Sequence, residues 1–158
     1  MNSSALASDD EAGRKLQKRL TGLSVRLPEG NGEPTKFSGT KYEFPANDLK
    51  LETVALEQDA VDGHETLITR IDGVEQRIVC GRGKWHEGLV AWGPLVQQPA
   101  ATAGGWTNDT FTAKICFYET PFVVTLRLKF AGDELTVNSE SNVGFGRTKQ
   151  PELVGKSR

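Results

Sequence analysis

The residues that most resemble catalytic machinery are Ser38 and Lys41, in the stretch FSGTKYEFPAND. Together they have the spacing S-x-x-K, in which a lysine helps to remove the proton from a nucleophilic serine. In such enzymes the serine begins a helix, and one helical turn brings the lysine beneath the hydroxyl group. The chemistry would therefore require a helix that starts at Ser38.

The residues around this motif predict a strand. Gly39 follows the serine, and residues 41–44 alternate in polarity before Pro45. On a strand, residues three apart point to opposite faces, so Ser38 and Lys41 would not meet. The S-D-N, Y-x-N and K-T-G motifs of such enzymes are absent from the sequence. We interpret Ser38 as a turn residue before a strand.

The two histidines, His64 and His86, are the other candidates for proton transfer. His86 stands beside Glu87 in KWHEG, which makes this pair the weak catalytic candidate for a histidine–carboxylate base. The alternative is that His86 is a loop residue packed on tryptophan. No G-x-S-x-G elbow is present in the sequence, and His64 is expected to be a solvated residue at the start of a strand.

Metal and cofactor signals are poor. The histidines and cysteines lack the paired spacing of a zinc site, and residues 59–65 lack the D-x-D-x-D-G pattern of a calcium loop. GRGKW lacks the ending of a phosphate-binding loop. We expect no metal and no cofactor. Cys80 and Cys116 could be free thiols or one bridge.

Aromatic residues gather in two stretches that could form a binding site. Residues 81–106 contain all three tryptophans and many glycines, and CFYETPF follows shortly afterwards. The first stretch is expected to be a short irregular strand with long loops, or a rim over a barrel mouth. Pattern alone does not separate core aromatics from pocket aromatics. The candidate ligand-binding residues are Trp85, Trp92, Trp106, Tyr118 and Glu119.

These residues must be positioned by a single domain with short extensions, as a length of 158 residues indicates. Leu16, Leu20 and Leu23 recur at helical spacing behind an acidic start. We predict a disordered tail at 1–8, an amphipathic helix at 9–23, a linker at 24–39, a β-barrel domain at 40–150 and a tail at 151–158.

The domain itself is expected to be mainly β. FVVTLRLKF, residues 122–130, alternates strictly between apolar and polar residues, as does the strand before it. Asp62-Gly63 and Asp72-Gly73 predict hairpin turns. Counting KYEF and NVGFG, about eight antiparallel strands result. We predict an up-and-down barrel, lipocalin-like or streptavidin-like, with the helix packed outside it or across one mouth.

Charge excludes several partners. The net charge is −2 and both signs are interspersed, so we expect no binding to nucleic acid or to an anionic membrane. No apolar run is long enough for a transmembrane helix, and the first residues do not resemble a signal peptide. The chain is expected to be cytoplasmic if it is complete. The oligomeric state is not predicted.

A family resemblance covers nearly the whole chain and is most specific in the last 50 residues. Trp106, Thr112–Lys114 and CFYETPF, followed by NVGFG and PELVG, resemble the C-terminal region of bacterial serine hydrolases of the β-lactamase-like class. GTKYEFPAND and TGLSVRLPEG resemble the start of that region. The resemblance implies a lipocalin-like accessory domain without the catalytic S-x-x-K domain. No catalytic residue carries over.

Two functions follow as expectations. The first is a non-catalytic barrel that binds a small, partly apolar molecule or docks on a serine hydrolase catalytic domain. The alternative is a small stand-alone hydrolase of esters or lactones that uses the tryptophan-rich loop around His86. A cluster of a histidine, a carboxylate or a metal at the barrel mouth would favour the alternative.

Overall fold

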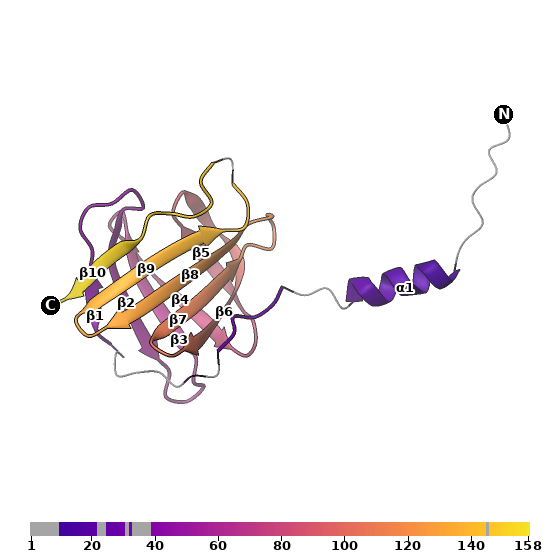
Figure 1. The fold of residues 1–158 in the computed structure, drawn as a ribbon, viewed down its shortest axis with the longest axis horizontal. Coiled ribbons are helices and arrows are strands. Elements are labelled where there is room, and N and C mark those ends of the chain that lie inside the picture. The colour runs from indigo at the N-terminus through magenta and orange to yellow at the C-terminus, as the bar shows by residue number, and fades with distance from the viewer. Residues whose placement is uncertain (1–9, 22–24, 31, 33–38, 145) are drawn as a thin grey trace.

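The computed structural model describes residues 10–21, 25–30, 32, 39–144 and 146–158 of the chain. It contains one helix and ten strands in those ranges (Figure 1). The elements are α1 (Asp10–Thr21), β1 (Lys41–Glu43), β2 (Leu51–Gln58), β3 (Glu65–Ile71), β4 (Val74–Arg82), β5 (His86–Trp92), β6 (Leu95–Thr107), β7 (Thr110–Cys116), β8 (Val123–Ala131), β9 (Glu134–Ser141) and β10 (Leu153–Ser157).

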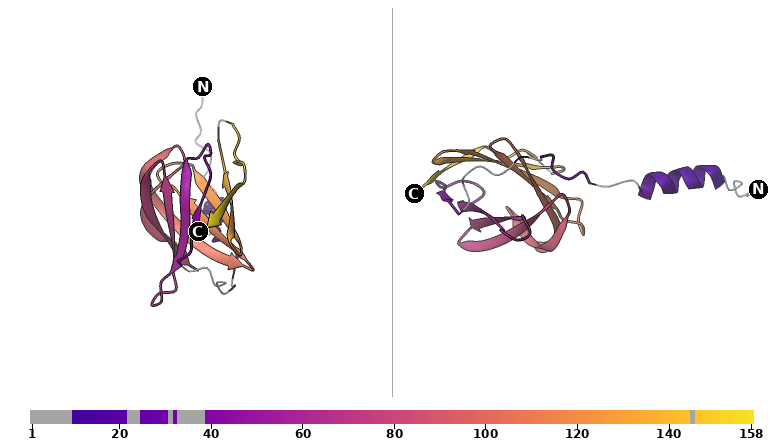
Figure 2. Two further views of the ribbon diagram at one scale, coloured as in Figure 1. Left: turned by 90° about the vertical axis from the view of Figure 1, so that its left-hand side faces the viewer. Right: turned by 90° about the horizontal axis from the view of Figure 1, so that it is seen from below.

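The strands form a lipocalin-like barrel, which confirms the predicted fold class. In the sheet, each strand from β1 to β9 is hydrogen-bonded to a strand adjacent in sequence, and β10 is inserted between β1 and β9. A short parallel pairing between β4 and β6 then closes nine strands into a ring, with β5 on the edge of β6 (Figure 2). Because the sheet closes on itself, most strands have a hydrogen-bonded neighbour on both sides, and few strand edges are left exposed.

Alternation along the strands determines which side chains face inward. Phe111, Ala113 and Ile115 of β7 are all 0 % exposed, and β8 buries Val124, Leu126 and Leu128 in the same way. The β3–β4 turn has positive φ angles of 49° at Asp72 and 77° at Gly73, as predicted for a type I′ hairpin. The type I′ turn predicted at Asp62-Gly63 is wrong: the β2–β3 connection is a longer loop in which Gly63, at 65°, but not Asp62 has a positive φ angle. In this loop the Asp59 carboxylate accepts hydrogen bonds from the backbone of Val61 and Asp62.

The predicted helix exists, but its predicted packing is wrong. In Figure 1, α1 lies apart from the barrel. Its described side chains are exposed, and Leu16 is 58 % exposed. No helix in the described part of the chain is long and apolar enough to cross a membrane. Because only a few leucines occupy its apolar stripe, α1 buries little surface and has a weak drive to pack on its own barrel.

Part of the predicted linker is fastened to the barrel. We call residues 25–30 the strap. The Lys114 amine donates a hydrogen bond to the carbonyl of Arg26 at 2.8 Å, and the Thr107 hydroxyl donates one to that of Glu29 at 3.3 Å. Gly105 makes room for the strap, because a Cβ there would lie 3.3 Å from the carbonyl oxygens of Pro28 and Glu29.

Three sequence predictions about strands are wrong. Residues 81–106 are not a loop-rich rim: they contain β5 and most of β6, which pair as an antiparallel hairpin. NVGFG forms no strand in its described part, because the Asn142 side chain bonds the backbone of Pro121 and Val123 and turns the chain. Residues 151–158 are no tail, since β10 pairs with β1 and β9.

The interior of the barrel is filled. Its largest fully buried side chains include Trp106, Tyr42, Phe111 and Phe117, each at most 2 % exposed. An exposed fraction near zero also means that these side chains line no void large enough for water. Gly104 is required for this packing, because a Cβ there would clash with the ring of Phe111.

Candidate functional site

The barrel wall has a seam between β4 and β5. Only Gly81 and Arg82 of β4 form ladder pairs with β6, opposite Ala103 and Gly104. The earlier residues of β6 pair with β5 instead. Among the described residues no ladder joins β4 to β5. The facing edges of these two strands therefore lack the main-chain hydrogen bonds that hold the rest of the ring together.

One side chain bridges this seam. The register of the β5–β6 hairpin shifts between Val90 and Trp92, so the intervening Ala91 has no ladder partner. The amide of Gln76 replaces that partner: its Nε2 donates to the Ala91 carbonyl at 2.5 Å, and its Oε1 accepts from the Ala91 N–H at 3.1 Å. A glutamine side chain thus acts here as a missing peptide group.

A groove of about 530 Å³ lies beside this bridge, between the tips of the β3–β4 and β5–β6 hairpins. We call it the seam groove. It is lined by Ile71, Asp72, Val74, Glu75, Gln76, Ala91, Trp92, Gly93, Pro94, Leu95, Val96 and Gln97. Its lips are apolar: Val74 is 69 % exposed and Val96 is 77 % exposed. Trp92, 5 % exposed, belongs to the hydrophobic core.

Of the five predicted ligand-binding residues, the structure places only Trp92 in this groove. Its ring N–H donates to the Ser139 hydroxyl at 3.1 Å inside the barrel. Trp106 is buried further along β6, and Trp85 is half-buried in the turn before β5. Tyr118 and Glu119 are exposed in the turn between β7 and β8. The aromatic residues therefore do not converge on one site.

The catalytic candidates are not assembled either. His86 and Glu87 are neighbours on β5, so their side chains point to opposite faces of the strand. The ring of His86 lies near that of His64, with centroids 6.4 Å apart, and His64 Nδ1 accepts a hydrogen bond from the Arg82 N–H. In the described part of the chain, no group of three or more histidine, cysteine or acidic residues is arranged to hold a metal.

Sequence analysis missed a buried carboxylate. Glu65 is 1 % exposed and faces the interior, where its Oε1 accepts a hydrogen bond from Trp106 Nε1 at 3.1 Å. Its Oε2 is buried without a hydrogen-bond partner. Burial raises the pKa of Glu65, although the charge of Arg82 and the Trp106 bond oppose the shift. The Asp-Gly dipeptides on either side of HETLITRI predicted the strand β3, but they carried no sign that the Glu65 side chain faces the interior.

Both cysteines are free thiols. Cys80 is fully buried, and burial together with the nearby Glu65 raises the pKa of its thiol to about 12. The thiol therefore stays protonated and is inert at neutral pH. Lys41 of the S-x-x-K motif begins strand β1 and is exposed, so it does not lie in the helix that the catalytic motif requires. Ser38 lies outside the described residues.

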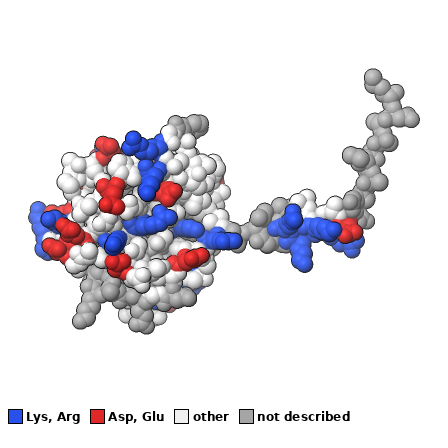
Figure 3. Space-filling model, in the orientation of Figure 1, with Lys and Arg blue, Asp and Glu red and all other residues white. Residues whose placement is uncertain are grey.

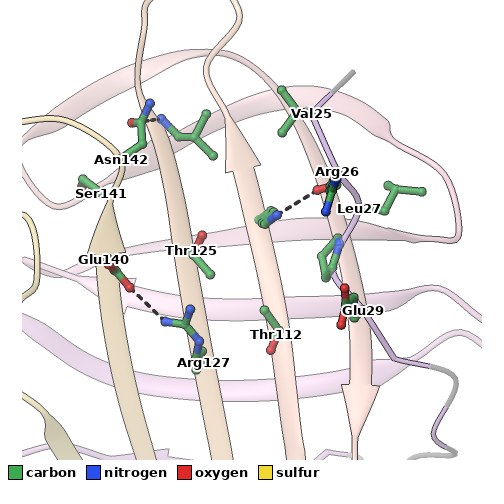
Figure 4. A pocket seen from close by; sticks show the side chains of 13 residues that line it. Val25, Arg26, Leu27, Glu29, Thr112, Thr125, Arg127, Glu140, Ser141 and Asn142 are labelled. Carbon is green, nitrogen blue, oxygen red and sulfur yellow. Dashed lines mark hydrogen bonds and ion pairs between the residues drawn. The ribbon is translucent and has the colours of Figure 1, made fainter. Parts of the chain in front are cut away.

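A second groove, of about 550 Å³, lies on the outer face between the strap and strands β7, β8 and β9 (Figure 4). It includes the cations Arg26, Lys114 and Arg127, and Figure 3 shows basic side chains in a row across this face. Several of its polar groups are already engaged. Arg127 pairs with Glu140 at 3.2 Å, and Lys114 bonds the strap. The seam groove is therefore the better candidate for a ligand.

Comparison with known proteins agrees with the fold. No family model and no curated protein matches the sequence. The chain is similar in structure to a fatty acid-binding protein from brain tissue of Drosophila melanogaster, solved without citrate inside. The TM-score is 0.58 at 16 % sequence identity, and the match covers 77 % of this chain and 99 % of that one. The chain thus shares the β-barrel fold of that protein.

Proposed function

We propose that this chain is a non-catalytic barrel that binds a small, partly apolar molecule in the seam groove. The observation that carries the proposal is the seam itself: in the described part of the chain no ladder joins β4 to β5, the Gln76 side chain joins β4 to Ala91 of β5, and Trp92 lies beside this bridge. The tight burial of the largest core side chains supports a site on the wall of the barrel.

The groove has the size and the surface for such a ligand. Its volume of about 530 Å³ is within the usual range for small-molecule sites, roughly 300–1,000 Å³. The side chains of Val74 and Val96 are exposed to water at the edges of the groove. A ligand that covers this apolar surface gains about 25 cal/mol of binding free energy per Å². The shared fold with a protein named for fatty-acid binding further supports a small apolar ligand.

The first test is calorimetric titration with decan-1-ol, a neutral amphiphile, kept below its solubility limit. We expect saturable binding to the full chain. Replacing both lips, Val74→Ser with Val96→Ser, should weaken binding about tenfold, because each serine removes apolar contact. The matched control is Val61→Ser with Val143→Ser, two exposed valines that do not line the groove.

Equal loss of affinity in the lip variant and in the control variant would contradict the proposal. So would unchanged affinity in both. Each variant is checked by circular dichroism and by its melting temperature, and little change is expected because all four valines are exposed.

A second candidate role is docking on a serine hydrolase catalytic domain, as the family resemblance implies. The observation that favours it is α1, whose apolar residue Leu16 is exposed and whose described side chains do not pack on the barrel. The strap holds the chain just beyond this helix against β6 and β7. The barrel would thereby present α1 from a fixed point to a partner.

A further inference from the structure

The seam groove carries negative charge and no positive charge. Asp72 and Glu75 are among the residues that line it, whereas no lysine or arginine is. The Asp72 carboxylate is paired from outside the groove by Lys50 at 3.0 Å. Glu75 stands opposite Arg70 in the β3–β4 ladder, but Arg70 pairs with Glu52 at 3.0 Å. Glu75 itself has no ion pair in the described part of the chain, and its side chain is exposed at the rim. An anionic ligand would approach this unpaired carboxylate.

The core behind the groove gives no compensation. The buried polar residues of the described chain are Glu65, Thr69, Thr102 and Ser139, so the only one of them that can be charged is a carboxylate. An anionic head group held in the groove, outside this filled core, would meet no lysine or arginine among the lining residues. Burial of an unpaired charge is far more costly than burial of a neutral group that forms hydrogen bonds.

A neutral or cationic head group has partners at the same place. The Gln76 amide uses one N–H and one lone pair on Ala91, which leaves a second donor and a second acceptor. Gln97 lies at the rim and is exposed. A hydroxyl group can bond either amide, and an ammonium group is in addition attracted by Glu75.

We infer that the seam groove selects apolar molecules with a neutral or positively charged head and discriminates against carboxylates. This inference rests on the proposed function and specifies its ligand class. A fatty acid would then be a poor ligand, although the hydrocarbon tail would fit as well as that of the corresponding alcohol or amine.

The test uses three ligands with one tail: decan-1-ol, decylammonium and decanoate, titrated calorimetrically into the full chain below their solubility limits and micelle concentrations. We expect decanol and the ammonium compound to bind, and decanoate to bind at least about tenfold more weakly. Glu75→Gln should weaken the ammonium compound about threefold and leave decanol unchanged. Asp62→Asn, a change at an exposed residue outside the groove, is the control and should change neither.

The outcomes separate the two proposals. If decanol binds in a lip-dependent way and decanoate binds as tightly, the charge selection is wrong and the proposed function stands. If decanol fails to bind, or binds independently of Val74 and Val96, the proposed function fails and the inference with it. Loss of ammonium affinity in Asp62→Asn equal to that in Glu75→Gln would also overturn the inference.

Discussion

At the scale of single residues, the interior of this barrel is unusual in holding a carboxylate that is half satisfied. Trp106 donates to one oxygen of Glu65, and the other oxygen has no partner. Such a group is more easily buried as the neutral acid than as the carboxylate. The raised pKa of Glu65 therefore links the stability of the fold to pH.

Ionisation of Glu65 destabilises the folded chain. A pKa raised above the ordinary 4.5 means that the folded chain holds the proton at pH values where the unfolded chain has released it. The stabilisation from Glu65 is complete below pH 4.5 and is lost as pH rises through the raised pKa. Glu65→Gln keeps the acceptor for Trp106 and removes the titration.

We therefore predict that the free energy of unfolding of Glu65→Gln, relative to that of the natural chain, increases from pH 4 to pH 7. Urea unfolding at several pH values measures it. Glu119→Gln, which changes an exposed carboxylate, should show a flat difference over the same range. Parallel curves for Glu65→Gln and the natural chain would contradict the prediction.

At the scale of elements, α1 and the strap contribute differently. The described side chains of α1 are exposed, whereas the strap forms hydrogen bonds with β6 and β7. A chain that begins at residue 25 should consequently unfold with a free energy within about 0.5 kcal/mol of the full chain. If α1 is the docking element, the same truncation should abolish co-elution with a serine hydrolase catalytic domain.

A marked loss of stability on truncation would show that α1 packs on the barrel in solution. Unchanged stability together with unchanged partner binding would instead remove α1 from the docking proposal and leave its exposure unexplained.

The seam is a join in the barrel wall at which no ladder connects the described residues of β4 and β5. Because Gln76 supplies both partners of the Ala91 backbone, Gln76→Ala should destabilise the fold by about 1–3 kcal/mol. It should also accelerate hydrogen exchange of the Ala91 amide, measured by NMR. Gln97→Ala, on the facing hairpin, should do neither. Equal exchange rates at Ala91 in both variants would show that Gln76 does not close the seam.

At the scale of the whole molecule, local patterns predicted most of the barrel. Strict alternation in 110–117 and 122–130 identified β7 and β8, and Asp72-Gly73 identified the turn between β3 and β4, because each signal lies within one hairpin. The C-terminal strand β10 was missed. Strand β10 pairs with β1, which lies more than 100 residues earlier in the sequence, and no local pattern encodes that contact.

The candidate site could not be predicted from sequence for a similar reason. Trp92 was proposed as a ligand-binding residue from its aromatic character, but Gln76, Val74 and Val96 read as ordinary solvent-facing strand residues. The positions of these three residues beside the groove depend on the absence of a ladder between β4 and β5 and on the register shift at Ala91. Both features depend on contacts between strands that are distant in sequence. A missing ladder has no sequence signature of its own.

A ¹H–¹⁵N NMR titration of the full chain with decan-1-ol would show where on the barrel the ligand binds. We predict that the amide shifts concentrate on residues 71–76 and 91–97, with Ala91 and Val96 among the largest changes, and that the strap remains unperturbed. Shifts concentrated on residues 25–29 and on β7 to β9, or no saturable shifts at all, would contradict the seam groove as the binding site.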